Sequence, residues 1–534
     1  MFIGAMRLLA VGFALLLACA ASPVRADWLR AETDHFIVYG DASEGDIRAF
    51  VQRVERFDGL LRAYYPIQVD HHIPKLEIFL ARGQRDMERV YPGIGGGVAG
   101  FYDSNSGRIY AVVDTQVMTG NVVLFHEYAH HFMFQMNSNS YPTWFVEGFA
   151  EYYATADIRS DRIQFGRHHP GRMSALNLGA NSWAKMEDVL TWRYTASGRY
   201  PAYLYYAQAW AMTHYFMSTP ERTRMLGAYL SAVIRGENSV EAMQAATGVT
   251  PEQLQNDVRM YMTGSINIWT PQIDLPQPQV SISRLSPSEA AMIWLDIRLD
   301  TTEVIEHPDE EDGQTRKSEA QKAREARERA EHRADLIRTS FTTAERFRGD
   351  RMSALVTARA HRLSHDPEAG FTALEPLIGA GSTDADALRL AGGLLLDLAN
   401  RETAPEAAAG RRRAAMGYLA RALDADPLDF RTYLDLNEAR RGLAGYPNDN
   451  DLSTLEAANA LAPQSFEVRL RLARAYLSRG MNNETVLILQ PVVNSPHRGR
   501  FTRLAREIIA AARGESVTTD DAPPPEETPA AAGA

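Results

Sequence analysis

Residues 121–136 read N-V-V-L-F-H-E-Y-A-H-H-F-M-F-Q-M, and residues 142–153 read P-T-W-F-V-E-G-F-A-E-Y-Y. Most of these residues are apolar, which predicts two buried helices. His126 and His130 are four residues apart, so on a helix they are separated by about 6 Å of rise and lie on nearly the same face. Both imidazoles can therefore reach one metal ion, with the carboxylate of Glu127 beside it.

A third metal ligand is expected from the second helix. A catalytic zinc site requires three protein ligands and one open position for water. Glu147 lies 17 residues after His130, and Thr143 is the expected N-cap of its helix. An acidic side chain in such an aromatic stretch is costly to bury unless it binds a partner. Glu147 is therefore the candidate for the third ligand.

The two segments resemble the gluzincin metallopeptidases, especially the peptidase-MA-like families. Their pattern is H-E-x-x-H, then a helix with W-x-x-E-G-x-A-E-Y, then a tyrosine on a later helix. The resemblance extends over roughly residues 28–262 and is concentrated in the two motif helices. It implies that His126, His130 and Glu147 bind zinc and that Glu127 is the general base.

The same resemblance implies roles for an acid and a tyrosine. Glu151, one turn after Glu147, would orient a ligand imidazole, and an ordinary surface position is its alternative. The segment Y-Y-A-Q-A-W-A at 205–211 resembles the tyrosine helix of the family. Tyr206, or else Tyr205, would then stabilise an oxyanion, although both belong to an aromatic stripe that is also typical of a core.

The implied reaction is the hydrolysis of peptide bonds by a zinc-activated water, so the expected substrate is a peptide or protein. The sequence does not decide between endopeptidase and exopeptidase action. The rival hypothesis is a non-catalytic, peptidase-like scaffold that binds partner proteins through helical repeats. Glu127 distinguishes the two, because only turnover requires a base.

The other histidines do not predict a second metal site, because adjacent residues point in different directions. We expect core positions for His131 and His214, and polar surface loops for His71, His72, His168 and His169.

Residues 1–26 are typical of an export signal, with Arg7 before an apolar run at 8–20. The single cysteine, Cys19, lies inside this segment, so cleavage would leave a protein without disulfides. A lipid anchor at Cys19 is the alternative, although Leu17 fits a lipoprotein signal poorly. We expect an exported, periplasmic or secreted protein without a transmembrane segment.

The charge pattern excludes one class of partner. The formal net charge is −11, and no basic face is interleaved with aromatic residues, so nucleic acid is not an expected partner.

The region after the motif helices is predicted to be helical, and its C-terminal part is repetitive. Helices that end near Pro427, Pro463 and Pro496 recur at intervals of 36 and 33 residues, which resembles tetratricopeptide repeats. Stacked repeats of this kind form a surface for protein partners.

Taken in order, these patterns predict an α+β protein. A small N-terminal sheet, with strands near 35–40 and 76–80 and a hairpin over 101–113, precedes the helical peptidase-like region. The expected domains are a signal peptide at 1–26, a gluzincin-like metallopeptidase domain at 27–264, a linker and charged helical spacer at 265–349, an all-α tetratricopeptide-like repeat domain at 350–513, and a disordered tail at 514–534.

Overall fold

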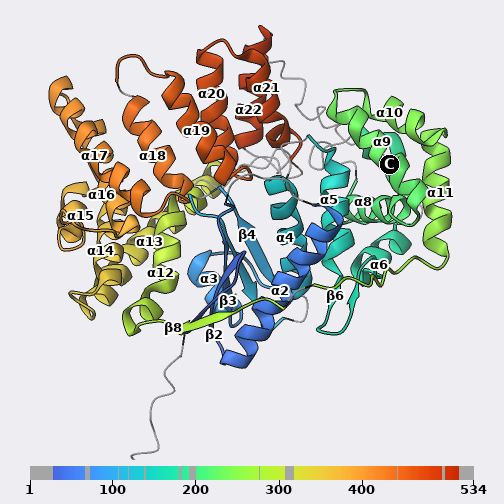
Figure 1. The fold of residues 1–534 in the computed structure, drawn as a ribbon, viewed down its shortest axis with the longest axis horizontal. Helices are drawn as coiled ribbons and strands as arrows, with labels where there is room; N and C mark the ends of the chain where they lie inside the picture. Colours follow the sequence, from blue (N-terminus) through green and yellow to red (C-terminus); the bar gives the residue numbers. More distant parts are fainter. Residues whose placement is uncertain are drawn as a thin grey trace, which may run out of the picture.

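The computed structural model contains an α+β first domain followed by an all-α repeat, which confirms the expected fold class (Figure 1). It describes residues 28–66, 72–105, 107–117, 120–136, 140–179, 183–191, 200–275, 277–306, 318–441, 443–495 and 500–515. The expected signal peptide with Cys19, and the tail beyond residue 515, lie outside the described residues. Within the described part of the chain, no helix is both long enough and apolar enough to cross a membrane.

A six-stranded mixed sheet forms the base of the first domain. In spatial order its strands are β4 (Gly100–Asp103), β5 (Tyr110–Asp114), β3 (Leu76–Ala81), β2 (Phe36–Asp41), β1 (Trp28–Glu32) and β8 (Ser281–Arg284). The pairs β2–β3 and β3–β5 are parallel, and the other three pairs are antiparallel. β2, β3 and the β4–β5 hairpin lie where the sequence predicts strands.

Helices make up most of the rest of this domain. They are α2 (Glu44–Tyr64), α3 (Gln84–Val90), α4 (Gly120–Met136), α5 (Thr143–Ala154), α6 (Pro170–Leu178), α7 (Met186–Thr191), α8 (Ala202–Phe216), α9 (Pro220–Ile234), α10 (Ser239–Thr247), α11 (Pro251–Thr263) and α12 (Pro287–Glu306). A short ribbon of β6 (Asp157–Ile158) and β7 (Ile163–Gln164) follows α5. α5 packs against both α4 and α8, so the two motif helices are neighbours as expected.

Side chains of the central strands alternate between two apolar layers, as the two-residue period of a strand requires. Ile78 and Leu80 belong to the larger core, together with residues of α2, α4 and α5. Phe79, between them, belongs to a smaller core on the opposite face, formed with α3 and α12. Helices therefore cover both faces of the sheet, and α4 is anchored on the larger core.

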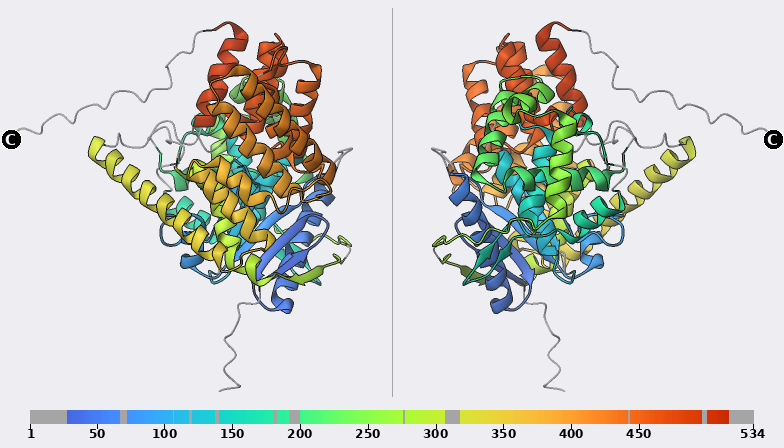
Figure 2. Two further views of the ribbon diagram at one scale, coloured as in Figure 1. Left: turned by 90° about the vertical axis from the view of Figure 1, so that its left-hand side faces the viewer. Right: turned by 90° about the vertical axis from the view of Figure 1, so that its right-hand side faces the viewer.

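The segment expected to be a linker and spacer, 265–349, contributes to the first domain. Its strand β8 pairs with β1 at the edge of the sheet. On α12, the ring of Trp294 packs edge-on against that of Trp28, with centroids 5.3 Å apart. The following helix, α13 (Glu319–Glu345), projects from the molecule at its N-terminal end and carries exposed ion pairs, as its alternating charges predict (Figure 2). The spacer character therefore applies to α13 rather than to the whole segment.

The C-terminal domain is a row of helices, each packed against the next (Figure 1). They are α14 (Arg351–Leu363), α15 (Pro367–Leu374), α16 (Ala385–Arg401), α17 (Pro405–Ala425), α18 (Phe430–Arg441), α19 (Asp449–Leu461), α20 (Phe466–Ser478), α21 (Asn482–Val493) and α22 (Arg500–Arg513). α17 and α19 end two residues before Pro427 and Pro463, as the repeat pattern predicts, whereas Pro496 lies outside the described residues.

Buried ion pairs join the first repeat helices to the sheet. Arg108, beside β5, lies 3.0 Å from a carboxylate oxygen of Asp296 on α12. Arg359 on α14, only 6% exposed, pairs with the same Asp296 and with Asp300, at 2.9 Å from the latter. Because a buried charge without its partner is strongly destabilising, this cluster fixes the start of the repeat against the first domain.

Gly148 allows α5 to approach α8 closely. A Cβ atom at this position would overlap the carbonyl oxygen of Ala209 and Oγ1 of Thr213. We expect Gly148→Ala to lower the free energy of unfolding by about 1–3 kcal/mol or more, because α5 must move away from α8. The measurement is the melting temperature.

The matched control is Gly227→Ala, on the exposed side of α9, where an added Cβ meets no atom within 4 Å. Alanine there should be neutral or stabilising by up to about 1 kcal/mol, since it is the better helix former. Similar melting temperatures for the two variants would contradict the packing argument.

Candidate metal centre

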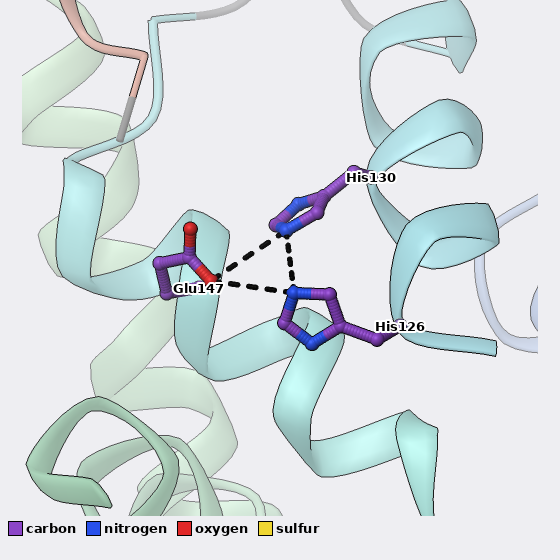
Figure 3. Close-up of side chains that lie close together, drawn as sticks. All are labelled: His126, His130 and Glu147. Atoms are coloured by element: carbon purple, nitrogen blue, oxygen red, sulfur yellow. Dashed lines mark hydrogen bonds and ion pairs between the residues drawn. The ribbon is translucent and has the colours of Figure 1, made fainter. Parts of the chain in front are cut away.

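The buried helix α4 presents His126 and His130 on one face. Both imidazoles turn their Nε2 atoms toward each other, 3.1 Å apart (Figure 3). His130 is buried, whereas the His126 side chain keeps 17% of its surface exposed. Solvent or a small ligand can therefore approach the pair from the side of His126.

The helix α5 supplies the acidic member of the site. All twelve of its residues are buried, and Glu147 has no exposed surface. The expected N-cap role of Thr143 is wrong, because the helix begins at Thr143 and the capping position is held by Pro142. The Thr143 hydroxyl instead donates to the carbonyl oxygen of Asn494 in the repeat, at 3.1 Å.

The three side chains converge on one point between the helices (Figure 3). Oε2 of Glu147 lies 3.5 Å from Nε2 of His126 and 3.6 Å from Nε2 of His130. A tetrahedral zinc ion with bonds of about 2.0–2.1 Å requires donor atoms roughly 3.3 Å apart. The observed spacings of 3.1–3.6 Å between the three donors fit that requirement.

The chemistry of the donors also fits a divalent metal. Two neutral imidazoles and one carboxylate leave a fourth position open, which is the donor set of catalytic zinc sites. A fully buried carboxylate next to two imidazoles is costly without a cation to balance it. Within the described residues, His126, His130 and Glu147 are the one group of such side chains close enough to share an ion.

Glu151 lies behind the site and holds His126. Its Oε1 atom lies 3.3 Å from Nδ1 of His126. Arg172 on α6 binds the same carboxylate with two donors, Nη2 at 2.5 Å and Nε at 2.9 Å. A hydrogen bond at Nδ1 leaves Nε2 of His126 available for a metal, so this contact sets the tautomer and the ring orientation. With only 1% of its surface exposed, Glu151 is not the ordinary surface residue that the alternative describes.

The electrostatics of the metal-free site centre on the His126–Glu151 pair. Burial lowers the pKa of His126, but the hydrogen bond to Glu151 and the surrounding carboxylates outweigh it and raise that pKa to about 9. Burial raises the pKa of Glu151, but His126 and Arg172 together hold it well below its usual range. The two groups form an ion pair when no metal is bound.

Two members of this network could not be recognised from the sequence. His169, expected on the surface, is the N-cap of α6, and its Nε2 atom lies 3.2 Å from Glu151. Arg172 follows one turn later and binds the same carboxylate. Neither residue belongs to a recognisable pattern, and both lie in a short segment whose position depends on the tertiary fold. His168, in contrast, is exposed as expected.

The two candidate tyrosines differ in their environments. Tyr205 is fully buried, and burial raises its pKa well above the usual value. Tyr206 is partly exposed, and the Arg172 guanidinium lies 5.1 Å from the centre of its ring. Tyr206 is thus on the side of the Glu151–Arg172 pair, whereas Tyr205 is enclosed in the core, where the nearby charge of Glu147 also raises its pKa. The role of Tyr206 in catalysis stays a prediction.

One family model matches part of the chain. Residues 122–234, which include α5, α8 and all of α4 except its first two residues, match a family model described as "Protein of unknown function (DUF1570)". A comparison with curated proteins finds no match. Among solved structures, the chain is similar to a thermophilic TPR protein of Thermus thermophilus, with 16% identity over 34% of this chain and 91% of that chain, and a TM-score of 0.30.

The raised pKa of His126 predicts how metal binding depends on pH. Since that pKa is about 9 in the metal-free protein, a bound metal must displace a proton from the imidazole at neutral pH. We expect the apparent affinity for zinc to rise about tenfold per pH unit between pH 7 and 8. Competition with a chromophoric chelator, at matched ionic strength, measures this slope.

The control is Glu151→Gln, which removes the main group that raises the pKa of His126. The affinity of this variant for zinc should be about 10–100-fold weaker than that of the wild-type protein but should vary less with pH. An affinity of the wild-type protein that does not change with pH would contradict the ion-pair description.

Proposed function

We propose that the chain is an exported, zinc-dependent metallopeptidase of the gluzincin type, which hydrolyses peptide bonds. The observation that supports this most directly is the convergence of His126, His130 and Glu147 at spacings that suit a tetrahedral ion. Each residue is carried on a buried helix, so the arrangement is rigid. The assignment to the periplasm or to secretion rests on residues 1–26.

A zinc ion held by these three side chains would lower the pKa of a bound water and polarise a peptide carbonyl. Glu127, next to His126 on α4, is partly exposed and is the base in this proposal. Its carboxylate accepts the proton of the attacking water and passes it to the leaving amine. Tyr206 donates a hydrogen bond to the oxyanion, consistent with its position on the exposed side of α8.

The surroundings of the motif support a gluzincin-like arrangement. Trp144 donates its indole N–H to the hydroxyl of Tyr229 at 3.0 Å, and Gly148 packs against α8. Glu151 binds His126 from behind. In this proposal Glu147 supplies a ligand and Glu151 orients one, while Trp144 and Gly148 fix α5. The repeat domain would recruit a substrate or partner protein in this proposal.

Replacing the base separates catalysis from metal binding. Glu127→Gln should retain about one zinc per chain but lower the turnover of a peptide library by about 10²–10⁴-fold. His130→Ala should lose both zinc and turnover, because it removes a ligand. Elemental analysis and proteomic profiling of cleavage products measure the two quantities. A wild-type protein that holds zinc but cleaves nothing would favour the scaffold hypothesis, and one that holds no metal would exclude the proposal.

The tyrosine assignment has its own test. Tyr206→Phe should lower kcat by about 10²-fold or more with little change in KM, because it removes an oxyanion donor but no ground-state contact. Tyr203→Phe is the matched control, since Tyr203 is on the same helix and 50% exposed. Equal kcat values for Tyr206→Phe and the control would remove Tyr206 from the mechanism.

A further inference from the structure

The end of the repeat touches the start of α5. Asn494, the C-cap residue of α21, accepts the Thr143 hydroxyl on its backbone carbonyl oxygen at 3.1 Å. Its side-chain amide donates to the carbonyl oxygen of Tyr141 at 3.3 Å and to the hydroxyl of Ser140. Thr143 is only 6% exposed and lies one helical turn before Glu147. The repeat therefore holds the chain directly in front of the acidic ligand.

A second contact reaches α4. Gln464, between α19 and α20, places its side-chain nitrogen 3.4 Å from Nδ1 of His131, the residue after the ligand His130. The hydroxyl of Tyr102 on β4 lies 2.9 Å from the same nitrogen of His131. The backbone carbonyl oxygen of Gln464 in turn accepts the Ser104 hydroxyl at 3.2 Å. Gln464 and His131 are both 3% exposed, so the polar contact is enclosed between the two domains.

Further contacts extend this interface without bringing in a ligand or a charge. The side chain of Asn105 accepts the backbone N–H of Phe466, the first residue of α20, at 2.8 Å. The rings of Phe466 and Phe134 on α4 meet edge to face, with centroids 6.2 Å apart. These contacts all join uncharged groups. This part of the interface therefore depends on the placement of hydrogen-bonding groups rather than on attraction between opposite charges.

The position of these contacts matters because the metal site spans two helices. A helix rises about 1.5 Å per residue, whereas metal–donor distances tolerate deviations of only about 0.2 Å. A slide of α4 or α5 by a fraction of one residue would separate Glu147 from the two imidazoles. Each helix is held by the repeat within one turn of its ligand, at His131 and at Thr143.

We propose that the C-terminal repeat positions the metal ligands, with Asn494 and Gln464 as positioning residues that set the axial placement of α5 and α4. This inference rests on the proposed metal site. It assigns the repeat a role inside the molecule, in addition to any partner that its free surfaces bind. Loss of either side chain lets its helix relax, so the three donors no longer match the ion.

The test compares metal affinity with fold stability in the full chain. Asn494→Ala and Gln464→Met remove the amide donors while leaving the ligands themselves unchanged. We expect each to weaken zinc binding by about tenfold or more, as loss of outer contacts to a metal site does. The visible absorption bands of the cobalt(II)-loaded protein should shift as well, because they report the geometry of the donors. Chelator competition and absorption spectroscopy give these two readouts.

Leu487→Ala is the matched control, because Leu487 is on α21 and 67% exposed. It should leave zinc affinity and the cobalt spectrum unchanged. If Asn494→Ala fails to fold, Thr143→Val removes the other hydrogen bond between these segments, from the Thr143 hydroxyl to the backbone carbonyl oxygen of Asn494. It should also weaken zinc binding and shift the cobalt bands. Variants that bind zinc as the wild type does, even with a lower melting temperature, would overturn the inference alone. A wild-type protein that binds no zinc would overturn the metal site and this inference together.

Discussion

The structure depends on the burial of one carboxylate. Glu147 has no exposed surface and lies on a helix whose other residues are mostly aromatic or small. An isolated carboxylate in such a place costs several kcal/mol, so the fold must bring positive or coordinating groups to it. The imidazoles of His126 and His130 on the neighbouring helix meet this requirement. The other elements therefore have to keep α5 packed between α4 and α8.

That packing is held from several sides. On α4, the hydroxyl of Tyr128 donates to Asp58 of α2 at 2.6 Å, which ties the ligand helix to α2. Glu151 and Arg172 tie α5 to α6. The repeat holds both ligand helices within one turn of their ligands, through His131 and Thr143. Elements that are distant in the sequence thus fix a site of three side chains, as precise metal geometry requires.

The sequence predicts those features of the fold and the site that depend on residues close together in the chain. The four-residue interval of His126 and His130, and the aromatic helix around Glu147, follow from periodicity and from the cost of burial. Helix pairs in the C-terminal region follow from their repeated prolines. Short β-rich segments likewise predicted β2, β3 and the β4–β5 hairpin. Each of these features depends on residues close together in the chain.

Features that depend on distant partners could not be predicted. Arg172 and His169 become part of the site only because α6 packs against α8, which brings both side chains to Glu151. The strand β8 joins the sheet beside β1, although all the helices from α2 to α11 separate the two strands in the chain. The contact between Gln464 and His131 spans 333 residues. No periodicity or spacing encodes such pairs, because side-chain direction and domain placement decide them.

The two contacts of the repeat have a thermodynamic consequence. If Asn494 and Gln464 improve the fit of the ligands to an ion, then an ion in the site must favour the docked repeat by the same free energy, because linkage is reciprocal. A partner that binds the repeat and alters the ends of α19 or α21 would then change the metal affinity. A partner that binds elsewhere on the repeat would not. The interface between the domains, rather than the repeat surface as a whole, is thus the place where binding and chemistry would be coupled.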